Sequence, residues 1–203
     1  MSKANSNTVS IGMRAKTGRA IAVVLAGPLD SPRVIRREEL TVWDPAIPAT
    51  YQPYHEVMEL PWEKAQVAVK KTERRIGAIA TKTLARLVEE LGAEGFVVCG
   101  VGIVGAGDRI LEKIGSTHIR AHAAEGVLFR QVLEAGAAAN GLPNRRFDEK
   151  TLEVTAELEL KPTGSERKSI LAEMGRAAGS PWRIDEKAAA TAAWLALSAH
   201  LQK

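Results

Sequence analysis

The strongest constraint on the fold of this 203-residue chain is an uncharged run, Gly95–Gly107, that combines valines and isoleucine with glycines. A short continuous apolar run of this kind predicts a strand that is buried on both faces. Its glycines indicate either a sharp turn or a close approach of another group to the backbone. We therefore expect this strand in the middle of a sheet, with its C-terminal end directed at the functional site.

Composition and charge narrow the class of protein. The formal net charge of +4 permits a polyanionic partner without requiring one. The single cysteine, Cys99, excludes an intrachain disulfide, and its place in the apolar run predicts a small buried core residue. The polar segment 1–8 predicts a disordered tail and not a secretory signal, and 9–203 should form one domain. No apolar run is long enough to span a membrane, so we expect a cytoplasmic protein without a membrane partner.

The first half of the chain has two kinds of hydrophobic pattern. Alternation over Val9–Met13, Ile21–Leu25 and Val34–Val42, with short turns between them, predicts an antiparallel three-strand meander. Prolines make Asp44–Pro61 an ordered loop. Apolar residues at helical spacing then predict a helix from Trp62 to Leu91, closed by a C′ glycine at position 92. Its opposite face is basic, which suits either a solvated surface or phosphate contacts: Lys70, Lys71, Arg74, Arg75 and Lys82.

The second half alternates between helix and strand patterns. We expect a helix over Ile119–Ala135 and one or two strands within Phe147–Leu160, where apolar and polar residues alternate. Ser165 is a good N-cap for a helix over Glu166–Ala178, and Asp185 is a good N-cap for a final alanine-rich helix. These elements together predict an α/β three-layer domain with a mixed sheet.

Two local motifs suggest chemistry but lack the context that the chemistry needs. Gly100, Gly102 and Gly105 match the G-x-G-x-x-G dinucleotide pattern, but the segment about twenty residues further on, where a strand should end in an acid, is helical. His118 and His122 have a metal-capable spacing of four residues. No third histidine, cysteine or carboxylate stands beside them at ligand spacing, so we interpret them as surface or polar-core histidines.

The order of the elements, together with three sequence segments, resembles the RuvC-type Holliday-junction resolvases of the RNase H-like superfamily. The first segment runs from Ala124 to Gly136 and ends in Glu-Ala-Gly, like one helix of that family. The second, Lys161–Lys168, corresponds to its threonine-glycine loop, and the third, Asp185–Leu197, to its closing Asp-x-x-Asp-Ala-x-Ala-x-Ala helix. The resemblance implies an RNase H-like three-layer domain, with a mixed five-stranded sheet and helices on both faces.

Enzymes of this family hold two divalent metals with about four carboxylates. The resemblance implies an aspartate on the first strand, a glutamate at the end of the central strand and two acids three residues apart in the last helix. The first strand instead carries Arg14 and Lys16, and the first acid after the central strand is the more distant Asp108. Asp185 matches the first helix acid, but Ala188 replaces the second. A single carboxylate does not hold two hard cations.

We therefore expect a catalytically inactive RuvC/RNase H-like protein that binds DNA or RNA, with Asp185 as a remnant of the catalytic set. Phosphate contacts need positive charge but no metal, so no cofactor or metal is expected. The residues expected at nucleic acid are basic or belong to the threonine-glycine loop: Arg14, Lys16, Lys161, Thr163, Arg167 and Lys168.

Three other functions remain open on the sequence. The first is an interaction or scaffold protein, such as a homodimer subunit, with an apolar surface patch around Tyr51, Tyr54, Trp62 and Trp182. The second is a magnesium-dependent nuclease with displaced ligands drawn from Asp108, Asp185 and Glu186. Dinucleotide binding is the third.

Overall fold

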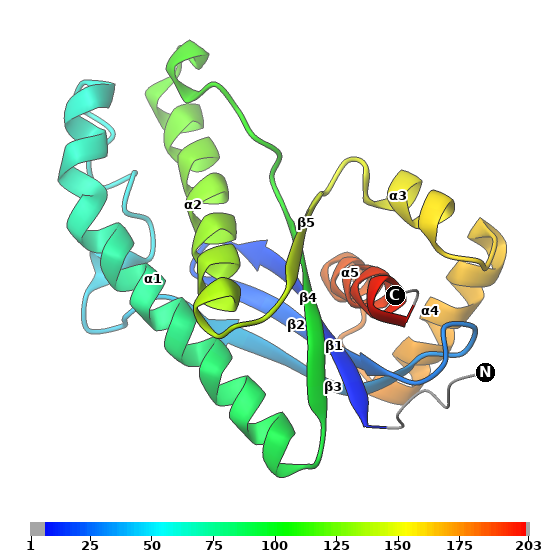
Figure 1. The fold of residues 1–203 in the computed structure, drawn as a ribbon. Coiled ribbons are helices and arrows are strands. Elements are labelled where there is room, and N and C mark those ends of the chain that lie inside the picture. Colours follow the sequence, from blue (N-terminus) through cyan, green and yellow to red (C-terminus); the bar gives the residue numbers. More distant parts are fainter. Residues whose placement is uncertain (1–6, 202–203) are drawn as a thin grey trace.

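The computed structural model describes residues 7–201 and contains one mixed five-stranded sheet with the strand order β3-β2-β1-β4-β5 (Figure 1). The strands are β1 (Thr8–Lys16), β2 (Arg19–Ala26), β3 (Arg33–Thr41), β4 (Val97–Gly105) and β5 (Asn144–Asp148). The helices are α1 (Trp62–Ala93), α2 (Thr117–Ala139), α3 (Leu152–Glu159), α4 (Gly164–Ala178) and α5 (Ile184–Leu201). Two short 3-10 turns, η1 (Pro48–Thr50) and η2 (Leu111–Lys113), lie in the connections.

The strand pairing confirms the predicted meander. Strands β1, β2 and β3 pair antiparallel in chain order, β4 pairs in parallel with β1, and β5 pairs in parallel with β4. The glycine-rich strand β4 is interior, as expected, but the middle of the sheet is β1. The expectation of a central β4 was wrong because only the five-residue β5 lies beyond it.

Helices cover both faces of the sheet, as the fold class requires (Figure 1). Helices α1 and α2 pack on one face, where Ile11 and Ile103 meet Leu84 and Phe129 in one apolar core. Helix α5, flanked by α3 and α4, packs on the other face over a second core that includes Trp194. The sequence-based prediction of a three-layer α/β domain is therefore confirmed.

Two strand glycines allow helix α5 to lie unusually close to the sheet. A Cβ atom on Gly12 of β1 would stand 1.8 Å from the Ala189 carbonyl oxygen, and one on Gly102 of β4 would stand 2.3 Å from that of Ala192. The Ser10 hydroxyl donates a hydrogen bond of 2.6 Å to the carbonyl of Ala193 in the same helix. The close approach that the glycine-rich run indicated is therefore that of a helix. Strand β4 also continues through Gly105, whereas a dinucleotide motif would open a helix there.

One strand prediction was wrong. Within Phe147–Leu160 only the first two residues belong to β5, and the rest forms mainly helix α3. Leu152, Ala156 and Leu160 are buried at a spacing of four, whereas Leu158 between them is 81% exposed. Apolar residues at every second position also stand four residues apart, which is a helical spacing. The hydrophobic period alone therefore does not distinguish a strand from a helix here.

Several predicted helix ends also differ. Helix α1 continues past Gly92 and stops before Gly95, which has a φ of 84° and serves as the terminating glycine. Helix α4 begins one residue before Ser165, with Thr163 as its N-cap. The Thr163 N–H donates to the Glu166 carboxylate over 2.7 Å, and this bond lowers the pKa of Glu166.

Asp185 is not the N-cap of α5 but a residue of its first turn. The acid that accepts from the backbone ahead of the helix is Glu186, which takes a hydrogen bond from the Arg183 N–H over 2.7 Å. The Asp185 carboxylate is therefore left for side-chain contacts.

Three smaller expectations concern Cys99, the N-terminal segment and membrane-spanning helices. Cys99 is half-buried, not fully buried, and burial raises the pKa of its thiol to about 11. Residues 1–6 of the expected tail lie outside the described residues, and Thr8 already belongs to β1. None of the helices described between residues 7 and 201 has the length and apolar character needed to cross a membrane.

Replacing Gly12 by valine should lower the free energy of unfolding by about 3 kcal/mol, because the new side chain collides with the α5 backbone and the helix must move away. Gly92→Ala is the control. A Cβ there meets nothing within 4 Å, so the helix should gain about 0.5–1 kcal/mol. Urea denaturation of both variants checks this, and equal stabilities would contradict the close packing.

Candidate functional site

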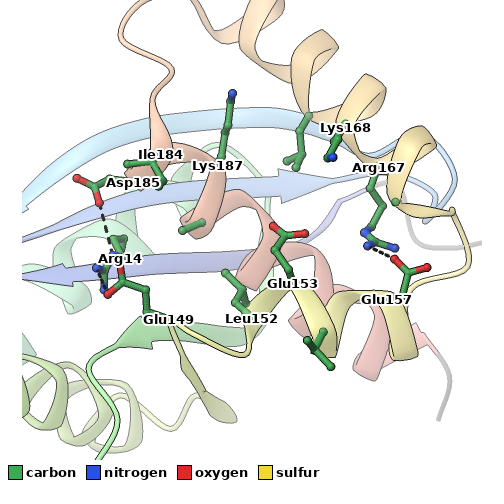
Figure 2. Close-up of a pocket in the computed structure, with 14 residues that line it drawn as sticks. Arg14, Glu149, Leu152, Glu153, Glu157, Arg167, Lys168, Ile184, Asp185 and Lys187 are labelled. Carbon is green, nitrogen blue, oxygen red and sulfur yellow. Dashed lines mark hydrogen bonds and ion pairs between the residues drawn. The ribbon is translucent and has the colours of Figure 1, made fainter.

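A cleft lies between α3, α4 and the start of α5, beside the end of β1 (Figure 2). Its volume is about 930 Å³. Its charged lining is mixed, with the basic residues Arg14, Arg167, Lys168 and Lys187 and the acidic residues Glu149, Glu153, Glu157 and Asp185. The cleft therefore contains side chains of both charges. The ion pairs among them determine which side chains remain available to a ligand.

Arg14 is the central cation of this cleft. Its side chain is buried near the end of β1, and its guanidinium pairs with Glu149 Oε2 at 2.5 Å and Asp185 Oδ1 at 3.5 Å (Figure 2). Lys16 approaches the second oxygen of Asp185 at 3.2 Å. Asp185 thus lies between two fixed cations. A guanidinium offers several donors in a rigid plane, so it binds carboxylates that would otherwise be ligands for a metal.

The end of β4, where the resemblance implied a glutamate, is occupied by Gly105, and Arg130 of α2 packs against it. A Cβ on Gly105 would lie 2.9 Å from the aliphatic part of Arg130. Arg130 is 1% exposed, and its guanidinium pairs with Asp108 and Glu134, each at 2.7 Å. Asp108 also pairs with Arg146 at 2.9 Å. The one acid that the sequence offered after this strand is therefore held by two arginines.

The structure brings some of the predicted nucleic-acid residues to the cleft and leaves others outside. Arg167 is buried and pairs with Glu157 at 2.5 Å, while Lys168 lines the cleft without an ion pair among residues 7–201. Lys161 and Thr163 lie in the turn that leads into α4 and are not part of the lining. Arg14 and Lys16 face Asp185, so the anion that they bind here belongs to the protein itself.

Sequence reasoning missed four charged cleft residues, Glu149, Glu153, Glu157 and Lys187. Glu149 follows β5 and Glu153 lies in the first turn of α3. Glu153 and Glu157 are four residues apart in α3 and lie on one side of that helix, whereas Glu149 precedes it. Reading this segment as a strand hid that signal, so the acids were not recognised as neighbours.

The cleft acids do not gather as metal ligands do. In the described part of the chain, the one group of three potential ligand side chains whose donor atoms converge consists of His55, His118 and His122. These histidines are not cleft residues, because they belong to α2 and the loop before α1. Any metal chemistry in the cleft would need the acids to separate from Arg14 first.

Comparison with known proteins identifies the fold. No family model matches the sequence, and no curated protein matches it either. Among solved structures, Thermus thermophilus RuvC has a TM-score of 0.53 at 13% identity over 96% of both chains. T. thermophilus RuvC in complex with a Holliday junction substrate has a TM-score of 0.52 at 14% identity, again over 96% of both chains. The yeast mitochondrial Holliday junction resolvase Ydc2 has a TM-score of 0.46 at 10% identity, covering 99% of this chain and 85% of the other.

The strand order and the helices on both faces define an RNase H-like α/β fold. Within that class, the two Thermus structures make the fold RuvC-like, since they align over almost the whole chain. At this level of identity the likeness concerns the fold.

Replacing Arg14 by alanine should lower the free energy of unfolding by about 2 kcal/mol, because hydrogen bonds to charged groups in a buried setting are lost. The matched control is Arg19→Ala, which removes an arginine of the next strand. Arg19 pairs with Glu39 at 3.4 Å on the surface, where such pairs contribute about 0–1 kcal/mol. Equal losses in urea denaturation would contradict a central role for Arg14.

Proposed function

We propose that this protein is a catalytically inactive RuvC/RNase H-like protein that binds DNA or RNA through the basic rim of its cleft. The observation that carries the proposal is the Arg14 guanidinium, which lies between Glu149 and Asp185 near the end of the first strand. It provides a permanent positive charge among the acids that would otherwise attract a divalent ion.

The two-metal mechanism explains why this replacement matters. Two cations a few ångströms apart stabilise the attacking and the leaving oxygen of a phosphodiester, and each needs several oxygen ligands. A guanidinium at the same place neutralises the acids but has no exchangeable ligand position and activates no water. With Ala188 in place of the second helix acid and Gly105 at the end of β4, the acids of the family pattern are reduced to Asp185.

Binding of a nucleic-acid backbone remains compatible with this cleft. Lys168 and Lys187 line it and have no ion pair among residues 7–201, so both are available for phosphate oxygens. Lys161 and Thr163 stand in the neighbouring turn. Phosphate contacts of this type position a backbone without reading its sequence. The Holliday junction bound to T. thermophilus RuvC supports nucleic acid as the ligand class to test first.

The aromatic residues suggested for a scaffold surface do not form one exposed patch. Tyr54 is buried and stacks on Trp62 with ring centroids 5.4 Å apart. Trp182 packs with the α5 core on the other face of the sheet and covers Gly175. These contacts weigh against the aromatic patch that the scaffold function would use.

Removing the two free lysines of the cleft should weaken nucleic-acid binding. Lys168→Gln with Lys187→Gln should flatten the slope of log affinity against log salt concentration by about two, one for each phosphate contact. Fluorescence anisotropy with a labelled duplex in a salt series measures this slope. The matched control, Lys70→Gln with Lys71→Gln, removes the same charge from the exposed side of α1 and should leave the slope unchanged. An equal effect in the control, or no salt-dependent binding at all, overturns the proposed interface.

Incubation of the protein with branched and unbranched DNA and Mg²⁺ or Mn²⁺ should give no cleavage above a protein-free control. Glu149, Glu153 and Asp185 are the acids that a nuclease with displaced ligands would use here. Metal-dependent cleavage that disappears in Asp185→Asn would establish that alternative and refute an inactive cleft.

A further inference from the structure

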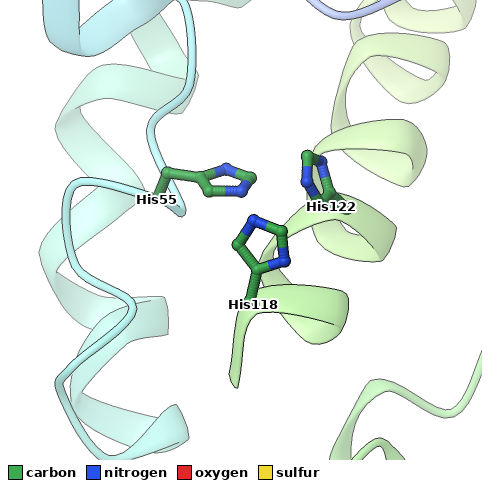
Figure 3. A group of neighbouring side chains, drawn as sticks. All are labelled: His55, His118 and His122. Carbon is green, nitrogen blue, oxygen red and sulfur yellow. The ribbon is translucent and has the colours of Figure 1, made fainter. Parts of the chain in front are cut away.

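Three of the four histidines of the chain meet on the face of the molecule that carries α1 and α2. His118 and His122 lie one turn apart near the start of α2, and His55 reaches them from the loop between η1 and α1 (Figure 3). The ring centroids are 4.3 Å apart for His55 and His122, 4.5 Å for His118 and His122, and 5.3 Å for His55 and His118. The sequence showed no third ligand beside His118 and His122, but the fold brings His55 next to them.

We propose that His55, His118 and His122 form a binding site for one divalent transition-metal ion, with Zn²⁺ as the best-suited occupant. One ring nitrogen of each histidine lies within 4.8 Å of the corresponding nitrogens of the other two. In a tetrahedral zinc site, Zn–N bonds of about 2.0–2.1 Å hold such nitrogens roughly 3.3 Å apart. Because His118 and His122 are exposed, rotation of their side chains is enough to close this gap.

Glu125 fixes His55 in the orientation that a ligand needs. Glu125 is completely buried in α2, and its Oε1 accepts from His55 Nδ1 at 2.8 Å and from the His55 backbone N–H at 3.2 Å. A carboxylate that already accepts a backbone N–H directs the imidazole proton to Nδ1 and leaves the Nε2 lone pair free. Hydrogen bonds of this kind between a carboxylate and a histidine are typical of the outer shell of zinc sites.

The free nitrogen of His55 has no other partner. His55 Nε2 is buried and makes no hydrogen bond within the described part of the chain. A buried polar atom without a partner costs free energy, and a metal ion removes that cost by accepting the lone pair. Its neighbours are the rings of His118 and His122, which supply two more nitrogen donors.

The loop that carries His55 is held in place before any ion binds. The hydroxyl of Tyr54 donates to Glu73 of α1 over 2.7 Å, and burial together with Glu73 raises the pKa of Tyr54, which keeps this hydroxyl protonated. Its ring stacks on Trp62 at the start of α1. These contacts tie the loop to α1 while Glu125 ties it to α2. Preorganised ligands favour binding because less conformational freedom is lost when the ion arrives.

The donor set also selects the class of ion. Three imidazoles suit Zn²⁺, Cu²⁺, Ni²⁺ or Co²⁺, whereas Mg²⁺ and Ca²⁺ prefer oxygen ligands. Three histidines leave one tetrahedral position open, and the exposure of His118 and His122 gives it access to water or a small ligand. The site shares no residue with the lining of the cleft, so it does not depend on the function proposed there.

The test uses the untagged full-length chain after removal of metals with a chelator. Isothermal titration with Zn²⁺ should show one site, and Co²⁺ should give the visible absorption typical of tetrahedral coordination. In proton NMR, the ring signals of His55, His118 and His122 should shift on addition of Zn²⁺, while those of His200 should not. Absence of stoichiometric binding, or shifts confined to other residues, overturns the proposal.

Variants separate the ligands from other histidine effects. His118→Gln with His122→Gln should abolish the binding, and both positions are exposed, so the fold should be retained. His200→Gln removes the fourth histidine, exposed near the end of α5, and should bind normally. Glu125→Gln should weaken Zn²⁺ binding by about 10–100-fold, as expected for an outer-shell partner. Unchanged affinity in the double variant, or an equal loss in His200→Gln, contradicts the assignment.

Discussion

The structure depends on how closely helix α5 lies against the sheet. Gly12 and Gly102 leave no side chain between the strands and the helix, and the alanines at positions 189 and 192 meet them with backbone carbonyls. Such contact fixes the height and the rotation of α5 over β1 and β4. The first turn of α5 is thereby held beside the end of β1, so that Asp185 faces Arg14. A bulkier residue at either glycine would move the helix and the cleft together.

Some elements of the fold can be predicted from the sequence alone, and others cannot. The meander, the helices and the glycine-rich strand follow from hydrophobic period and from turn residues, and the structure confirms them. The segment 149–160 does not follow in this way, because its alternating residues satisfy both a strand and a helix. The starts of α4 at Gly164 and of α5 at Ile184 depend on which of several neighbouring polar residues accepts hydrogen bonds from the first backbone N–H groups, and propensity alone does not rank these residues.

The candidate site could be predicted from the sequence less completely than the fold. The absence of acids at Arg14 and Ala188 is readable from the resemblance, but the partners of Arg14 are not, since Glu149 and Asp185 come from elements far apart in the chain. The third histidine was hidden for the same reason. Sequence spacing finds ligands on one helix, such as His118 and His122, whereas His55 joins them only through the path of a long loop.

The cleft and the histidine cluster differ in where their positive charge comes from. In the cleft, Arg14 and Lys16 are covalently part of the protein, so the charge near Asp185 does not depend on the metals in solution. At the histidine cluster, the protein supplies three imidazole rings and one buried carboxylate, Glu125, which is stabilised by positive charge that arrives at His55. The cleft and the proposed metal site lie on opposite faces of the sheet. Titration with Zn²⁺ and with nucleic acid should consequently give two independent equilibria, because the sites share no side chain and lie in different layers.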